Sequence, residues 1–212
     1  MSLDFAATWR DVQSRVGFYT FANRGAIPEG AGVYAWFCPL WLFSEDLGAV
    51  VGGVQAILDF DAPADGKAER ECYVDFNWER VALSVSKSSR ARLTDEMYQH
   101  WESMKSTDGL RDVFQRTLME ASVFLPPLYV GHADALRTRY DQHASGSTGF
   151  AERFQRNIER TPEGVPRLGV SDLVFACIEM NPLDAGMVRK HNLHLLLEQV
   201  AMRLARPPYS SR

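Results

Sequence analysis

The 212-residue sequence predicts an α/β fold in which short strands and helices share one core. Residues 33–37, 128–131 and 170–180 are short apolar runs of the kind that form buried strands. Longer segments around them repeat apolar residues at helical spacing. A composition of 46% apolar and 24% charged residues is typical of one globular domain, so we expect a single domain over residues 1–212.

The chain begins with a predicted helix, a loop and a strand. Apolar residues recur at helical spacing over residues 4–16. Four glycines and a proline then predict a loop over residues 17–32. The strand at residues 33–37 follows and opens with the tripeptide Gly32-Val33-Tyr34.

The middle of the chain is less regular. Residues 49–60 fit either a helix or a strand, and the pattern alone does not decide between them. Residues 72–76 and 81–85 alternate like paired strands around residues 77–79. Two helices are expected next, over residues 94–104 and 110–124. The second carries an apolar stripe made of Leu110, Val113, Phe114, Leu118 and Ala121.

The last third predicts three helices around two strands. After the strand at residues 128–131, a basic helix is expected over residues 134–143 and another over residues 151–160, with a Gly/Ser-rich break between them. The strand at residues 170–180 precedes a long helix over residues 184–205 that stops before Pro207-Pro208. Its inward residues are expected to be Leu193, Leu196, Leu197, Val200 and Leu204.

Charge and composition exclude several classes of protein. A net charge of -4 argues against a protein that coats nucleic acid without specificity, although residues 129–212 carry 11 Lys and Arg against 9 Asp and Glu. The sequence contains no apolar run of membrane-spanning length and no secretion signal at its start, so we expect a cytoplasmic protein without a membrane partner. The three cysteines are widely separated and are expected to be reduced thiols.

Four residues of the sequence lie at a distinctive spacing. Tyr34 ends the tripeptide Gly32-Val33-Tyr34, and Tyr129 begins the tripeptide Tyr129-Val130-Gly131. Arg139 lies eight residues after Gly131, and His143 lies one helical turn further, so both share one face of the predicted helix. Either tripeptide alone is common in core strands, whereas the combination is specific.

This pattern resembles the GIY-YIG nuclease family, which has two such motif strands, an arginine at that offset and often a histidine one turn later. The family also has a glutamate on a later helix, which Glu198 matches. It then has an asparagine in a short Pro- and Tyr-containing context, and the segment Arg206-Pro207-Pro208-Tyr209-Ser210 stands at the matching distance. The resemblance covers about half the chain. It implies a small, mainly antiparallel sheet flanked by helices, an α+β arrangement built from the three predicted strands.

Two features depart from the family pattern. The motif strands are usually joined by a short turn, but here 94 residues separate Tyr34 from Tyr129. We therefore expect an inserted α/β subdomain over residues 39–126 that serves target recognition or dimerisation, which loop-closure entropy permits. Ser210 stands where the family has asparagine, and its single donor and shorter reach predict reduced activity.

The resemblance implies hydrolysis of phosphodiester bonds. Tyr34 would act as the general base, Arg139 would bind the phosphate, and Glu198 would hold Mg²⁺ or Mn²⁺. Tyr129 and His143 would position Tyr34 or the attacking water. An unperturbed phenol has a pKa near 10, roughly 4 kcal/mol from neutrality. A tyrosine base therefore needs a positive charge nearby, or the proton passes through Tyr34 to a neighbour such as His143 or to bulk water.

Other charged residues and two histidines can each be interpreted in two ways. Arg137, Arg153 and Arg156 are candidates for contacting nucleic acid, and the alternative is that they are solvated surface charges. His191 and His194 fall on one helical face with Glu198 and would complete a metal site. We expect these two histidines to be surface side chains instead.

The sequence thus predicts a restriction- or defence-like endonuclease. Its expected partner is double-stranded DNA, with a homodimer or a protein complex as its assembled form. The alternative is a catalytically weakened or inactive nucleic-acid-binding subunit on the same scaffold, which Ser210 and the acidic insertion motivate. Structure-selective repair cleavage is less attractive, because the sequence contains no helix-hairpin-helix or zinc module.

Overall fold

The computed structural model describes residues 4–58, 68–76, 79–87, 93–161 and 163–180, together with residues 186, 196, 200, 207 and 209. The fold is α+β, with a four-stranded antiparallel sheet and helices packed around it, as the sequence predicts at that level. None of the helices in these segments is long and apolar enough to cross a membrane.

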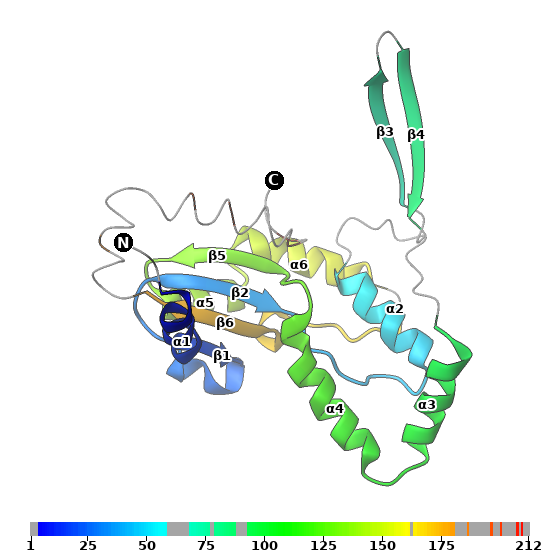
Figure 1. Ribbon diagram of the computed structural model, residues 1–212, viewed down its shortest axis with the longest axis horizontal. Helices are drawn as coiled ribbons and strands as arrows, with labels where there is room; N and C mark the ends of the chain where they lie inside the picture. Colours follow the sequence, from blue (N-terminus) through cyan, green and yellow to red (C-terminus); the bar gives the residue numbers. More distant parts are fainter. Residues whose placement is uncertain are drawn as a thin grey trace.

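The sheet has the strand order β1-β6-β2-β5, and every neighbouring pair is antiparallel (Figure 1). Its strands are β1 (Val16–Tyr19), β6 (Val174–Glu179), β2 (Gly32–Phe37) and β5 (Tyr129–Ala133). The central strand β2 carries the first motif, and its neighbour β5 carries the second. The three predicted strands are therefore present and adjacent.

Strand β1 was not predicted, because its four residues begin at a helix end and contain Gly17. A run this short has no detectable periodicity, and pairing with β6 determines its conformation. Strand β6 also begins later than expected. Val170–Asp172 forms a 3₁₀ turn, η3, in which the Asp172 carboxylate accepts a hydrogen bond from the backbone N–H of Gly169 at 2.8 Å.

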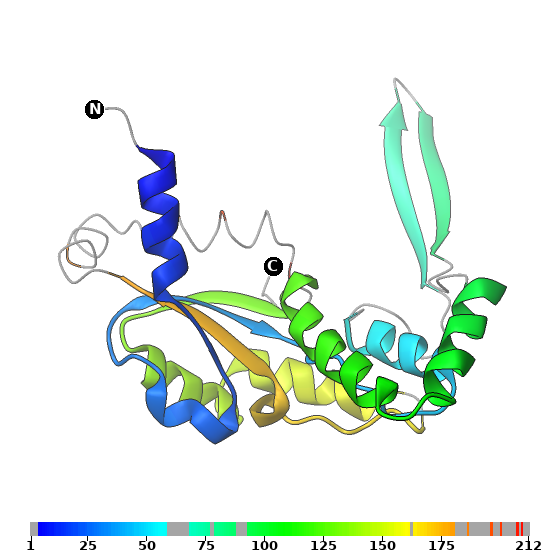
Figure 2. The same ribbon diagram turned by 60° about the horizontal axis from the view of Figure 1, so that its bottom comes forward.

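Helices α5 (Leu136–Ala144) and α6 (Gly149–Glu159) cover one face of the sheet (Figure 1). Strand β2 buries alternate residues toward them, including Tyr34 and Trp36. Trp36, Tyr140, Phe154 and other fully buried side chains form this core. Helix α1 (Phe5–Arg15) projects from the opposite side (Figure 2), and the short helix η1 (Phe21–Ala26) follows β1.

The segment between the motif strands forms additional α and β structure, as expected. It contains α2 (Leu47–Leu58), the hairpin of β3 (Ala68–Phe76) and β4 (Glu79–Lys87), α3 (Asp95–Lys105), α4 (Leu110–Ala121) and η2 (Ser122–Phe124). The undecided segment 49–60 is thus helical up to Leu58. The hairpin extends away from the sheet in both views (Figures 1 and 2).

The insertion has a small core of its own and also joins the main core. Val50, Trp101 and Met104 pack together, and the Trp101 indole donates a hydrogen bond to the Glu45 carbonyl at 2.9 Å. Ile57 on α2 is instead part of the main core. Residues 39–126 are therefore anchored to the rest of the domain through α2.

The apolar stripe of α4 faces solvent at several positions. Leu110 and Val113 are 41% and 48% exposed, and no α4 residue is fully buried. The inward side is held by Gln115, which accepts a hydrogen bond from the Leu42 N–H at 2.6 Å and donates one to the Leu40 carbonyl at 3.2 Å. Polar anchoring thus adds to the limited apolar packing of this helix, such as the edge-to-face contact of Phe114 with Trp101.

Of the predicted helix at residues 184–205, only Gly186, Leu196 and Val200 lie within the described residues, and each is helical. Leu196 and Val200 are 58% and 44% exposed, so the prediction that these two face inward is wrong. At these positions the helix does not bury its apolar side chains against the sheet.

Candidate active site

The site is centred on a hydrogen bond between the first motif strand, β2, and helix α5. The Tyr34 hydroxyl lies 2.8 Å from Nε2 of His143, and both side chains are almost completely buried. Tyr34 comes from the central strand β2, and His143 from the last turn of α5. The histidine expected to position Tyr34 therefore contacts its hydroxyl directly.

Glycine at the second motif leaves room for this contact. Gly131 on β5 lies opposite Tyr34 on β2. A Cβ atom at position 131 would lie 2.6 Å from the Tyr34 hydroxyl, closer than real Cβ contacts allow. The Tyr34 hydroxyl thus occupies the space that a side chain at position 131 would fill.

Gly32 in the first motif is required for a different reason. A Cβ atom there would lie 2.4 Å from the carbonyl oxygen of Ile178, which belongs to the neighbouring strand β6. Because that obstacle is backbone, a rotamer change cannot relieve it. Gly32 therefore permits the close approach of β2 and β6 directly beside Tyr34.

Tyr129 completes an aromatic cluster around the hydrogen bond. Its ring centroid lies 6.0 Å from that of Tyr34 and 5.5 Å from that of His143. It packs against Phe150 on α6 at 4.9 Å. These contacts restrict the orientation of all three rings.

His143 is held from both sides of its ring. Its second nitrogen, Nδ1, lies 2.7 Å from the Thr148 hydroxyl oxygen. Burial, and secondarily the positive charge of Arg139, lower the pKa of His143 to about 3. The imidazole is therefore neutral near pH 7 and has one N–H donor and one acceptor.

Arg139 lies one helical turn before His143 and is half-buried. Within the described residues, its guanidinium makes no hydrogen bond and no ion pair. The N–H donors of this guanidinium thus bind no group in the described part of the fold. Its positive charge contributes to the lowered pKa of His143. This is the arrangement required of a group that binds an external phosphate.

The neighbouring Arg137 is engaged in the fold. Its guanidinium donates to the carbonyl oxygens of Gly25 at 2.7 Å and Ile27 at 2.8 Å, and to the Glu29 carboxylate at 2.7 Å. These bonds fasten the start of α5 to the loop before β2. They favour a structural role for Arg137 over the predicted nucleic-acid contact.

The two candidate arginines on α6 differ in the same way. Arg153 donates two hydrogen bonds, at 2.6 and 3.0 Å, to the carbonyl oxygen of Tyr209. Arg156 is exposed and makes one long hydrogen bond to the Glu152 carbonyl at 3.4 Å. Of the three arginines expected to bind nucleic acid, Arg156 is the least constrained by the protein.

Tyr209, in the Pro-x-Tyr context, is docked beside the second motif. Its N–H donates to the carbonyl of Leu128, the residue before Tyr129, at 3.0 Å. Its buried hydroxyl donates to the Ile57 carbonyl at 2.7 Å and accepts from the Asn157 amide. Tyr209 is therefore tied to the residue before β5, to α2 and to α6, while Ser210 lies outside the described residues.

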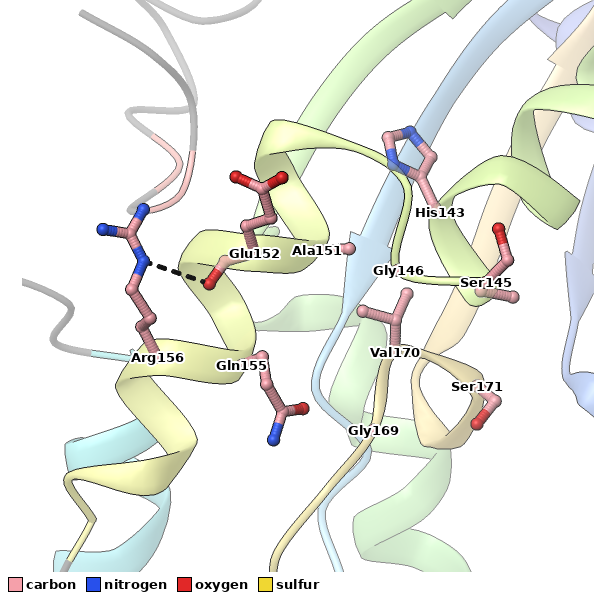
Figure 3. Close-up of a pocket in the computed structure, with 11 residues that line it drawn as sticks. His143, Ser145, Gly146, Ala151, Glu152, Gln155, Arg156, Gly169, Val170 and Ser171 are labelled. Atoms are coloured by element: carbon pink, nitrogen blue, oxygen red, sulfur yellow. Dashed lines mark hydrogen bonds between the residues drawn. The ribbon is translucent and has the colours of Figure 1, made fainter.

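An open cavity of about 530 Å³ lies on the flank of His143 (Figure 3). Its walls come from the end of α5, from α6 and from η3. Glu152, Gln155 and Arg156 line one side, and Val170 and Ser171 the other (Figure 3). Arg156 is thus the one candidate nucleic-acid contact that borders this opening.

The predicted metal ligand Glu198 lies outside the described residues, as do His191 and His194. Among the residues that the structure does describe, no group of three or more His, Cys, Asp or Glu is placed to hold a metal ion. A metal at Glu198 therefore remains a prediction from the sequence.

Thr148 and Asn157 were not singled out from the sequence. Thr148 precedes helix α6 and caps it, since its hydroxyl accepts from the Ala151 N–H at 3.3 Å. A threonine between a Gly/Ser-rich break and a helix is a recognisable cap signal, but its bond to His143 is a tertiary contact that spacing does not indicate. Asn157 carries no sequence signal of its role.

Comparison with protein-family models, with curated proteins and with solved structures finds no match. The nuclease resemblance therefore rests on the motif residues of this chain and on their arrangement.

Proposed function

We propose that this chain is a GIY-YIG-type endonuclease that hydrolyses phosphodiester bonds, with DNA as its substrate and a divalent metal ion as its cofactor. One observation carries the proposal. Tyr34, Tyr129 and His143, grouped on sequence spacing alone, meet around a single 2.8 Å hydrogen bond. Arg139 lies on the same helix within electrostatic reach of His143.

In the proposed reaction, a water oxygen forms a bond to phosphorus while the bond from phosphorus to the leaving oxygen breaks. Tyr34 accepts the proton of the attacking water and passes it to solvent, and the leaving oxygen takes a proton from solvent. Arg139 stabilises the extra negative charge on the nonbridging oxygens. Mg²⁺ or Mn²⁺ at Glu198 would supply charge neutralisation at the leaving oxygen.

The neutral state of His143 matters for the proposed base. A charged imidazolium beside Tyr34 would itself stabilise the phenolate, whereas a neutral ring supports Tyr34 only through its hydrogen bond. Burial and Arg139 both keep this ring neutral. The positive charge that a tyrosine base needs then comes from Arg139 and the metal.

The proposed biological role is restriction or defence. Residues 39–126 supply a subdomain with its own small core and a projecting hairpin, which suits target recognition or dimerisation. Cutting both strands of DNA usually takes two active sites related by a two-fold axis, so the proposal includes a homodimer. Sedimentation of the purified protein tests this, and a strict monomer on cognate DNA would argue against it.

A second candidate function is nucleic-acid binding or complex assembly without cleavage. Ser210, in place of the family's asparagine, is the observation that favours it. The two functions differ in one property, since only the first requires metal-dependent bond breakage.

The test is to incubate purified protein with plasmid, single-stranded and branched DNA in Mg²⁺ or Mn²⁺, with chelator controls and the variant Glu198→Ala. The proposal predicts metal-dependent cleavage that Glu198→Ala abolishes. A preference for plasmid favours a restriction role, and a preference for branched DNA favours repair. Binding without cleavage of any substrate would support the second function.

A further inference from the structure

Thr148 makes two hydrogen bonds with its side chain. Its Oγ1 atom accepts from the backbone N–H of Ala151 at 3.3 Å and lies 2.7 Å from Nδ1 of His143. The other nitrogen of that ring, Nε2, lies 2.8 Å from the Tyr34 hydroxyl. A continuous chain of hydrogen bonds thus runs from the N-terminus of α6 to the proposed base.

The direction of these hydrogen bonds depends on the tautomer of His143. If Nδ1 carries the proton, the ring donates to Thr148 and accepts from Tyr34. If Nε2 carries it, the ring accepts from Thr148 and donates to Tyr34. A neutral imidazole allows one of these arrangements at a time, and burial with a pKa of about 3 keeps the ring neutral.

The hydroxyl of Thr148 distinguishes the two arrangements. Among the described residues, the one acceptor within reach of its proton is Nδ1 of His143. Accepting from Ala151 and donating to Nδ1 engages both the oxygen and the proton of the Thr148 hydroxyl within the described residues. In the Nδ1-protonated form the Thr148 oxygen would accept both bonds, and its proton would be left to solvent, which reaches this partly buried residue.

We infer that Thr148 is a positioning residue that holds His143 in the Nε2–H tautomer, so that His143 donates a hydrogen bond to the Tyr34 oxygen. The inference rests on the proposed function, in which Tyr34 is the base. A donor aimed at a phenol oxygen stabilises the phenolate form more than the phenol, because charge-assisted hydrogen bonds are the stronger ones. Thr148 would thus make Tyr34 a better base without touching the substrate.

Nuclear magnetic resonance of protein labelled with ¹⁵N at histidine tests the assignment directly. The two neutral tautomers give different ¹H–¹⁵N correlation patterns in the imidazole ring, and a His143→Gln variant identifies the signals of His143. The parent protein is expected to show the Nε2–H pattern near pH 7. The Nδ1–H pattern in the parent would overturn the inference, whatever the behaviour of any variant.

Two substitutions then test the role of Thr148. Thr148→Val keeps the shape and removes the hydroxyl, whereas Thr148→Ser keeps the hydroxyl. We expect Thr148→Val to lose the pure Nε2–H pattern and to cut kcat by roughly tenfold with KM unchanged, and Thr148→Ser to restore both. A Thr148→Val protein that retains the Nε2–H pattern would overturn the inference.

The spectrum also separates failure of this inference from failure of the proposed function. The tautomer can be observed without any cleavage, so an inactive parent with the Nε2–H pattern would reject the nuclease and leave the tautomer assignment standing. An active parent with the Nδ1–H pattern would reject only the role of Thr148. Thr148→Val also loses the cap of α6, which is why the parent spectrum is decisive if that variant does not fold.

Discussion

The Tyr34 hydroxyl and Nε2 of His143 lie 2.8 Å apart, although the two residues are 109 positions apart in the chain. Strand β5 brings them together, because it pairs with β2 opposite Tyr34 and leads into α5 within a few residues. The fixed offset between Gly131 and Arg139 thus has a physical meaning. It places the face of α5 that bears Arg139 and His143 next to the first motif strand.

Substituting Gly131 is expected to disrupt the site without unfolding the sheet. In Gly131→Ala, the new methyl group would lie 2.6 Å from the Tyr34 hydroxyl, so the tyrosine must move away from His143. We predict at least a roughly hundredfold loss of cleavage, the scale expected for a displaced general base. A plasmid-cleavage assay measures it.

Gly52→Ala is the matched control. Gly52 lies in α2, and a Cβ atom there would meet nothing within 4 Å. The variant should cleave like the parent and gain about 0.5–1 kcal/mol of stability from helix propensity. Equal activity of Gly131→Ala and Gly52→Ala would contradict the proposed geometry.

Substitutions of Arg137 and Arg139 are expected to have different effects, one on stability and the other on activity. Arg137→Ala removes hydrogen bonds to two backbone carbonyls and should lower the free energy of unfolding by roughly 1–3 kcal/mol. Arg139→Ala removes no such bond to the described residues and should abolish cleavage with a stability change within about 0.5 kcal/mol. Urea unfolding and cleavage rates of both variants check this, and the reverse pattern would exchange the two roles.

The buried His143 predicts sensitivity to acid. Its pKa is lowered from 6.5 to about 3 by burial and by Arg139, so the unfolded chain binds this proton at a higher pH than the folded protein does. The free energy of unfolding should therefore fall as the pH drops from 6.5 toward 3, by about 1.4 kcal/mol per pH unit at most from this group.

The variant His143→Gln lacks the titrating ring and should lose stability less steeply over the same pH range. Urea unfolding of the parent and the variant at a series of pH values measures the two slopes. Parallel slopes would show that His143 is not neutral and buried in the folded protein.

Tyr209 is expected to support the site from a distance. Tyr209→Phe removes a buried hydroxyl that bonds both the Ile57 carbonyl and the Asn157 amide. Leaving those groups without this partner should cost roughly 1–3 kcal/mol of stability. Thermal unfolding provides the measurement, and an unchanged transition would mean that the anchoring of the C-terminal motif does not depend on this hydroxyl.

Much of this organisation was predictable because it depends on local pattern and fixed spacing. The motif strands are bounded by glycine and proline, and the one-turn spacing of Arg139 and His143 defines a helix face. Helices α3 and α4 of the insertion were predicted from their sequence pattern, whereas the pattern of α2 fitted a helix or a strand equally, and the α4 stripe is largely exposed. Periodicity identifies an amphipathic helix, but it does not show what covers the apolar side.

The remaining features depend on tertiary contacts. Strand β1 forms because it pairs with β6, and nothing within its four residues indicates that partner. The bonds from Thr148 to His143 and from Asn157 to Tyr209 join separate elements through side chains that are common in any sequence. The different roles of Arg137 and Arg139 likewise become visible only when the loop before β2 is seen against α5.

The most direct test of the account compares Tyr34→Phe with Tyr140→Phe in Mg²⁺-dependent DNA cleavage. Both variants remove one buried phenolic hydroxyl, but the Tyr140 hydroxyl has no hydrogen-bond partner among the described residues. We predict that Tyr34→Phe abolishes cleavage while it still folds and binds DNA, and that Tyr140→Phe cleaves at the parental rate. Cleavage by Tyr34→Phe at the rate of Tyr140→Phe would contradict the assignment of Tyr34 as the base.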